Sequence, residues 1–132
     1  MIGYRGVYEH LGKASARLDD LVNLIPARLA GLLLVAASGI LPGQRIAGAW
    51  RIMWQHHSRT QSPNAGWTMS GMAGALGVQL QKVAPDVGYT LGEPNRPIEP
   101  KDITRAVQSM YLVALSGLAI ALAVAYARGS IF

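Results

Sequence analysis

The sequence contains no cysteine among its 132 residues. This absence excludes disulfide bonds, thiolate ligands for metals and a cysteine nucleophile. Charged residues are also scarce, because they make up only 14% of the chain while hydrophobic residues make up 51%. A soluble domain carries nearer to about a quarter charged residues. A chain of this length forms one domain, and its low charge predicts a surface that faces lipid or a protein partner.

The basic residues do not form runs, although the 12 Lys and Arg give a net charge of +5. Nucleic-acid-binding tails usually contain blocks of like charge, so the scatter argues against a nucleic-acid partner. A net positive charge without basic runs suits binding to anionic lipid or to a phosphorylated substrate. The sequence also lacks a Walker A motif and a nucleophile elbow. His56 and His57 are adjacent and His10 is distant, so we expect no metal site built from histidine.

The clearest apolar segment runs from Met110 to Ala127 and carries no charge. Its length of about 18 residues is near the minimum for a membrane span, and Tyr111 and Tyr126 lie near its ends, where aromatic belts form. The alternative is a buried helix in a soluble core, but so small a chain could hardly surround a helix that is apolar on all sides. Because Pro100 suits a first helical turn, the sequence predicts one helix from about 100 to 127.

A second candidate span covers residues 21–41. Its apolar part, 29–41, is short for a span by itself, and the extension back to Leu21 includes Asn23, Pro26 and Arg28. An arginine inside a span costs several kcal/mol unless it is paired. We expect a span with a polar entry, and the alternative is a re-entrant or interfacial helix.

The predicted fold class is therefore an all-α integral membrane protein with about two transmembrane helices. A polar, loop-rich middle segment, 42–109, lies between them in the sequence. The whole chain, 1–132, is expected to form a single membrane domain. Trp50 and Trp54 belong to an apolar stripe within 44–57, which suggests an interfacial or amphipathic helix. The middle segment holds seven of the 12 Lys and Arg, which favours a cytoplasmic middle and both termini on the opposite side.

The strongest polar cluster lies at the start of the second candidate span. It consists of Arg17, Asp19, Asp20, Asn23 and Arg28. Carboxylates at a membrane boundary can bind a metal or activate an amine, and arginines can bind phosphate through forked hydrogen bonds. The alternative is an internal salt bridge with a helix cap. A second, weaker signal is the turn from Ser62 to Trp67, where Asn64 lies beside Gly66, and a glycine there can expose backbone amides to an anion.

Several stretches in the same order resemble the adenosylcobinamide-phosphate synthase family of cobalamin biosynthesis, often called CobD or CbiB. The matching text lies at residues 1–5, 16–29, 62–67, 72–78, 92–93, 96–97 and 102–103. The resemblance implies a multi-pass enzyme of the cell (inner) membrane. It implies ATP-dependent formation of an amide bond between adenosylcobyric acid, an adenosylcorrinoid, and an amino-alcohol phosphate, usually aminopropanol phosphate, with magnesium ATP as co-substrate.

The resemblance also suggests roles for individual residues. Asp19, Asp20 and Arg17 are the candidate catalytic residues. The candidate substrate-binding residues are Asn23, Arg28, Ser62, Asn64, Gly66 and Trp67. Among these, Arg17, Arg28 and Asn64 are candidates for binding phosphate, whereas Asp19 and Asp20 are candidates for binding magnesium or accepting the proton of the amine. No protein ligand set for a resident metal is expected.

Members of that family are much longer than this chain, and a long N-terminal half with its own membrane helices precedes the matching text in them. We therefore expect the chain to correspond to the C-terminal portion and to need an N-terminal half or an oligomeric partner for activity. The alternative is a non-catalytic membrane scaffold, or an inactive fragment of the enzyme.

Overall fold

The computed structural model describes residues 9–85 and 88–129, so the family-like text at residues 1–5 lies outside the described residues. Over the described ranges the chain forms five α-helices, one 3-10 helix and two short strands. The helices are α1 (Glu9–Val22), α2 (Leu24–Ile40), α3 (Ile46–His56), α4 (Ala65–Leu76) and α5 (Pro100–Ala127), and the 3-10 helix η1 (His57–Arg59) follows α3. The expectation of a mainly helical protein is confirmed.

A small hairpin corrects the expectation of an all-α fold. Strand β1 (Leu80–Lys82) pairs antiparallel with β2 (Tyr89–Leu91), and Leu80 lies opposite Leu91. Strands of three residues are too short to show the alternation of apolar and polar residues that marks a strand in a sequence. The hairpin is instead held by tertiary contacts, because Leu91 is completely buried against the helices.

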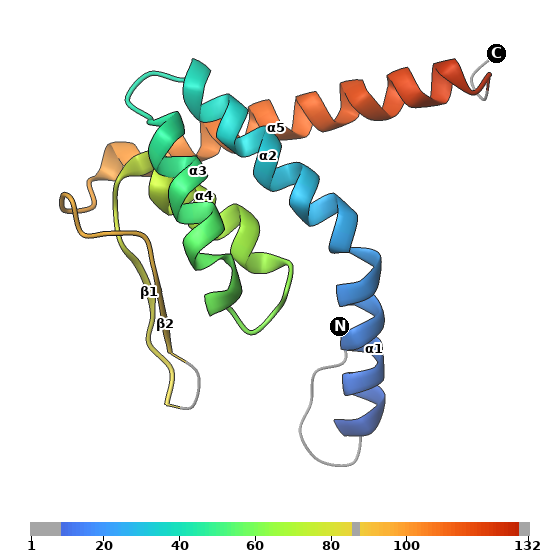
Figure 1. Ribbon diagram of the computed structural model, residues 1–132, viewed down its shortest axis with the longest axis horizontal. Helices are drawn as coiled ribbons and strands as arrows, with labels where there is room; N and C mark the ends of the chain where they lie inside the picture. The colour runs from blue at the N-terminus through green and yellow to red at the C-terminus, as the bar shows by residue number, and fades with distance from the viewer. Residues whose placement is uncertain (1–8, 86–87, 130–132) are drawn as a thin grey trace.

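The candidate span over residues 21–41 is broken. The helix predicted over 21–41 is interrupted at Asn23, where α1 ends and α2 begins, and the two helix axes differ by 51°. Pro26 gives the physical reason, because a proline has no N–H to donate to the carbonyl of Val22 four residues earlier. Proline is tolerated in the first turn of a helix, so α2 begins anew at Leu24 (Figure 1).

The centre of the fold is the contact between α3 and α4, which lie side by side in Figure 1. Gly48 and Gly74 face each other there, and a methyl group on either residue would collide with the backbone carbonyl of the other. Ala49, Met53 and Ala73 are fully buried around this contact. Close approach of the two backbones therefore depends on the absence of two side chains, and α2 packs over the same pair of helices.

The last helix is anchored at its start and extends away from the body of the molecule (Figure 1). Glu99 and Asp102 form a capping box, and Arg96 binds the buried Asp102 carboxylate through two hydrogen bonds of 2.8 and 2.6 Å. The side-chain amide of Gln44 donates a hydrogen bond of 2.8 Å to the Ser109 hydroxyl, which ties the helix to the loop between α2 and α3. The bounds Pro100–Ala127 confirm the predicted single helix.

The apolar part of α5 is uncovered by the rest of the described chain. By length and composition, α5 is the one helix in the described ranges that is long and apolar enough to cross a membrane. The bent pair of α1 and α2 passes the same test only when the two helices are taken as one span.

Candidate functional site

The candidate site forms where α1 ends beside the segment that leads into α4. The hydroxyl of Ser62 donates a hydrogen bond of 2.8 Å to a carboxylate oxygen of Asp20. The side-chain amide of Asn64 donates another, of 2.7 Å, to the backbone carbonyl of the same aspartate. Ser62 and Asn64, which are 42 and 44 residues from Asp20 in the sequence, thus join the segment before α4 to the end of α1.

A pocket of about 410 Å³ lies at this junction. Its lining residues are Asp19, Asp20, Asn23, Pro26, Ala27, Ala30, Ser62, Asn64, Ala65 and Thr68. Both aspartates line the pocket, and neither forms an ion pair with another described residue. The interpretation of the cluster as an internal salt bridge is therefore not supported within the described part of the chain. The pocket is rich in acceptors and suits a cationic or hydrogen-bond-donating ligand.

Asn64 is held firmly although it precedes the helix. It is 8% exposed, and it occupies the position before the first residue of α4 without capping that helix through its side chain. Its side-chain amide nitrogen donates to the backbone carbonyl of Asp20. Its side-chain oxygen is buried and has no hydrogen-bond partner in the described structure. A buried amide oxygen without a partner costs about 1–3 kcal/mol. The Asp20 contact is thus maintained against a local penalty.

The two arginines of the predicted cluster do not line this pocket. Arg17 is exposed on α1. Arg28 donates a hydrogen bond of 2.7 Å to the carbonyl of Leu24, and its guanidinium carbon lies 5.0 Å from the centre of the Trp67 ring. The two aspartates of the expected set therefore line the pocket, whereas Arg28 lies over the ring of Trp67.

Trp67 is the centre of a cluster of rings that also contains Trp54 and His57. It is 7% exposed, and the ring of His57 stacks on it with the ring centres 4.3 Å apart. Trp54 contacts the same ring edge-on at 5.2 Å. Burial lowers the pKa of His57, and the positive charge of Arg28 lowers it further. Both effects favour the neutral imidazole over the charged form.

Gly66 allows a close approach, but the neighbour is this chain itself. A side chain at position 66 would overlap the backbone of His57. The glycine thus permits η1 to pack on the start of α4, which brings His57 onto Trp67. Of the residues predicted to contact substrate, Asn23, Ser62 and Asn64 line the pocket with the two aspartates, whereas Gly66 and Trp67 shape the fold beside it.

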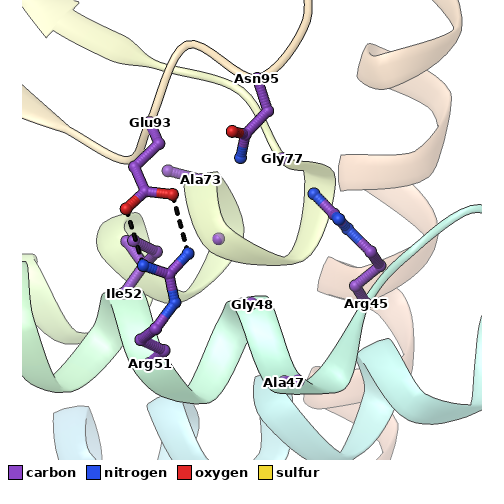
Figure 2. A pocket seen from close by; sticks show the side chains of 10 residues that line it. Arg45, Ala47, Gly48, Arg51, Ile52, Ala73, Gly77, Glu93 and Asn95 are labelled. Atoms are coloured by element: carbon purple, nitrogen blue, oxygen red, sulfur yellow. Dashed lines mark hydrogen bonds and ion pairs between the residues drawn. The ribbon is translucent and has the colours of Figure 1, made fainter.

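A second polar pocket was not predicted from the sequence. It has a volume of about 360 Å³ and contains the side chains of Arg45, Arg51, Glu93 and Asn95 (Figure 2). Glu93 belongs to the family-like text, but no local pattern joins it to Arg51, which is 42 residues distant. Only the packing of the loop 92–97 over α3 and α4 creates this site.

The acidic pocket thus lies between the break from α1 to α2 and the segment that leads into α4. The sequence model of one known family, described as CobD/Cbib protein, matches residues 1–110. The chain belongs to the CobD/CbiB family. No solved structure matches it.

Three relatives illustrate the likeness. The chain is 54% identical over 104 residues to the cobalamin biosynthesis protein CobD of Dehalococcoides mccartyi, which covers 79% of this chain and 32% of the relative. It is 40% identical over 126 residues to CobD of Streptococcus sanguinis, covering 89% and 39%. It is 38% identical over 131 residues to the cobalamin biosynthesis protein CbiB of Salmonella typhimurium, covering 93% and 40%. The chain thus spans between 32% and 40% of the length of these three relatives.

Proposed function

We propose that this chain acts in cobalamin biosynthesis as part of a membrane enzyme that joins adenosylcobyric acid to an amino-alcohol phosphate by an ATP-dependent amide bond. Family membership supports the pathway. The observation that carries the proposal at the level of residues is the acidic pocket, in which Asp20 is positioned by Ser62 and Asn64. Aminopropanol phosphate is the amino-alcohol phosphate that the family resemblance favours.

The chemistry requires an acceptor beside the reacting amine. A carboxylate oxygen of the corrinoid attacks the terminal phosphorus of ATP, ADP leaves, and an acyl phosphate forms. The amine nitrogen then attacks the carbonyl carbon. The bond from that carbon to the phosphate oxygen breaks, phosphate leaves, and the nitrogen loses a proton. Ser62 donates to one carboxylate oxygen of Asp20 and leaves the other without a bond to a described residue. That second oxygen is available to accept the proton of the amine.

The same carboxylates suit the magnesium ion that accompanies ATP. Magnesium is commonly bound by one or two carboxylates together with the phosphates of the substrate. Asp19 and Asp20 supply two, and no group of three His, Cys, Asp or Glu side chains that could hold a metal occurs among the described residues. This donor set fits a metal that arrives with the nucleotide rather than a resident metal centre.

The proposal includes a membrane location and a partner. We infer that α5 spans the cell (inner) membrane, that the bent pair of α1 and α2 forms a second membrane element, and that the protein is multi-pass. The support is the uncovered apolar surface of α5 and the polar site next to the break at Asn23. Because the acidic pocket is open, further helices from an N-terminal half or from an oligomeric partner would be needed to exclude water during acyl transfer.

The test is amide formation by the assembled enzyme. The chain is co-expressed with the portion of a family relative that it does not match, and turnover is measured with adenosylcobyric acid, aminopropanol phosphate and magnesium ATP. We expect Asp20→Asn to lower turnover by about a hundredfold to ten-thousandfold, since general base catalysis contributes that much. Glu99→Gln, which changes a carboxylate outside the pocket, is the control. Equal turnover for Asp20→Asn and Glu99→Gln would remove Asp20 from the reaction. No turnover in any assembly would favour the non-catalytic scaffold.

A further inference from the structure

The second pocket lies between the first half of α3, the end of α4 and the loop 92–97, apart from Asp20. Figure 2 shows the side chains of Arg45 and Asn95 pointing into the pocket, while the paired Arg51 and Glu93 lie on its other side. The lining carries two arginines and one glutamate, and is therefore positively charged on balance. Gly48, Gly74 and Gly77 form part of the lining and add no side chain to it.

The guanidinium of Arg45 has no hydrogen bond or ion pair with another residue of the described chain. It points into the pocket, where it lies beside Gly77. A methyl group at position 77 would come within 2.7 Å of a guanidinium nitrogen. Gly77 also ends α4 in the left-handed conformation, with φ of 67°. One glycine thus ends the helix and makes room for the cation.

Arg51 is oriented by a fixed partner. Two parallel hydrogen bonds of 2.7 Å join its guanidinium to both carboxylate oxygens of Glu93. A guanidinium has five N–H donors, so this pair leaves donors for a further ligand. The pocket also meets the start of α3 at Ala47 and Gly48, and α3 has no acidic residue in its first turn to compensate the positive end of the helix dipole.

We propose that this pocket binds a phosphate group through the free guanidinium of Arg45, with Arg51 as a second donor. Phosphate is favoured because forked guanidinium donors match its oxygens, and because the pocket combines the unpaired cation of Arg45 with side-chain donors from α3 and from the loop 92–97. The phosphate can belong to a nucleotide or to a small phosphate monoester such as an amino-alcohol phosphate. The inference does not rest on the amide-forming activity, since binding can be measured without turnover.

The first experiment measures the binding of inorganic phosphate to the purified chain in a non-ionic detergent by calorimetric titration. We expect Arg45→Gln to weaken phosphate binding by about tenfold or more, since a hydrogen bond to a charged group contributes enough for that change. Arg128→Gln removes another exposed arginine, which lies outside the pocket, and should bind like the unchanged chain. Absence of phosphate binding by the unchanged chain, or equal affinities for Arg45→Gln and Arg128→Gln, would overturn the proposal.

A variant that is expected to strengthen phosphate binding separates an effect on binding from an effect on folding. Glu93→Gln removes the single negative charge of the lining and should strengthen phosphate binding, whereas a damaged fold would weaken it. A weaker affinity in Glu93→Gln, with the far-ultraviolet circular dichroism of the unchanged chain, would count against an anion site. Parallel titrations with ATP and with aminopropanol phosphate identify the source. The compound whose binding depends on Arg45 is the ligand, and if neither depends on Arg45 the assignment fails.

Discussion

Asn64 donates its side-chain amide to the backbone carbonyl of Asp20 over 2.7 Å and so joins the start of α4 to the end of α1. The contact is buried on the Asn64 side, and it places the last turn of α1 over the pocket. Together with the Ser62 hydrogen bond, it fixes the position and the direction of one carboxylate.

Replacing Asn64 tests how much this contact contributes. We expect Asn64→Ala to lower the free energy of unfolding by about 1–3 kcal/mol, because the carbonyl of Asp20 loses a donor and a small cavity is left. The measurement is urea unfolding in detergent followed by tryptophan fluorescence. Asn95→Ala, at an exposed position, should change stability by less than about 0.5 kcal/mol. Equal stability for both variants would show that the Asp20 contact adds nothing.

Gly74 and Gly117 form a matched pair of helical glycines. Gly74→Ala places a methyl group against the carbonyl of Gly48 and within 2.8 Å of the Ile52 side chain. We expect a loss of about 1–3 kcal/mol or more, since a closely packed core must move apart. Gly117→Ala meets nothing within 4 Å and should gain about 0.5–1 kcal/mol of helix stability. Thermal unfolding in the same detergent gives both values, and a harmless Gly74→Ala would contradict the close approach of α3 and α4.

The ion pair of Arg96 and Asp102 anchors α5. The Asp102 side chain is 4% exposed, and Arg96 also donates hydrogen bonds of 2.9 and 3.1 Å to the carbonyl of Leu76. We expect Arg96→Ala to cost about 3 kcal/mol, because a buried carboxylate loses its main partner. Lys101→Ala breaks a pair whose lysine is 61% exposed and should cost less than about 1 kcal/mol. Limited proteolysis between the end of β2 and α5 should accelerate in the first variant alone.

His56 gives the fold a dependence on pH. It is buried, its Nδ1 accepts a 2.9 Å hydrogen bond from the backbone N–H of Gly92, and burial followed by the charge of Arg59 lowers its pKa. A lowered pKa means that the folded state takes up a proton less readily than the unfolded state. Stability is therefore complete above the ordinary value of about 6.5 and falls as the pH drops below it.

The experiment compares unfolding free energies between pH 8 and pH 5. His57, whose pKa is also lowered, contributes in the same direction, so His56→Gln should reduce the pH dependence without abolishing it. His10→Gln, at an exposed position of α1, should leave the dependence unchanged. A stability that rises on acidification over this range would contradict the neutral, hydrogen-bonded state of His56.

The absence of cysteine allows the orientation of α5 to be measured with single introduced thiols. Ile98 is 59% exposed just before α5, and Arg128 follows its last residue. If α5 spans the membrane with its start in the cytoplasm, a membrane-impermeant thiol reagent labels Ile98→Cys only in inverted vesicles and Arg128→Cys only in intact spheroplasts. Labelling of both positions from the same side would exclude a span.

Much of the helical pattern was predictable from local sequence. The uncharged run from Met110 to Ala127, preceded by Pro100, defined α5 because a helix that is apolar on all sides is encoded by its own residues. The break at Asn23 was not predicted, although Pro26 was visible, because a proline near a helix start can either begin a helix or interrupt one. The hairpin of β1 and β2 was missed because its strands are short and depend on the burial of Leu91.

The sequence by itself determined the apolar helices and the scarcity of charge. It also predicted a set of polar site residues, which included Arg17 and Arg28 as well as Asp20 and Asn64, and their chemical roles remain predictions. Only the tertiary structure decided which polar residues meet. It joined Asp20 to Asn64, placed Arg28 on Trp67 and formed the pocket of Arg45, Arg51 and Glu93. The physical reason is that helix formation depends on neighbours three and four residues away. A contact between residues more than 40 positions apart depends on how closely helices approach, which here is set by Gly48 and Gly74.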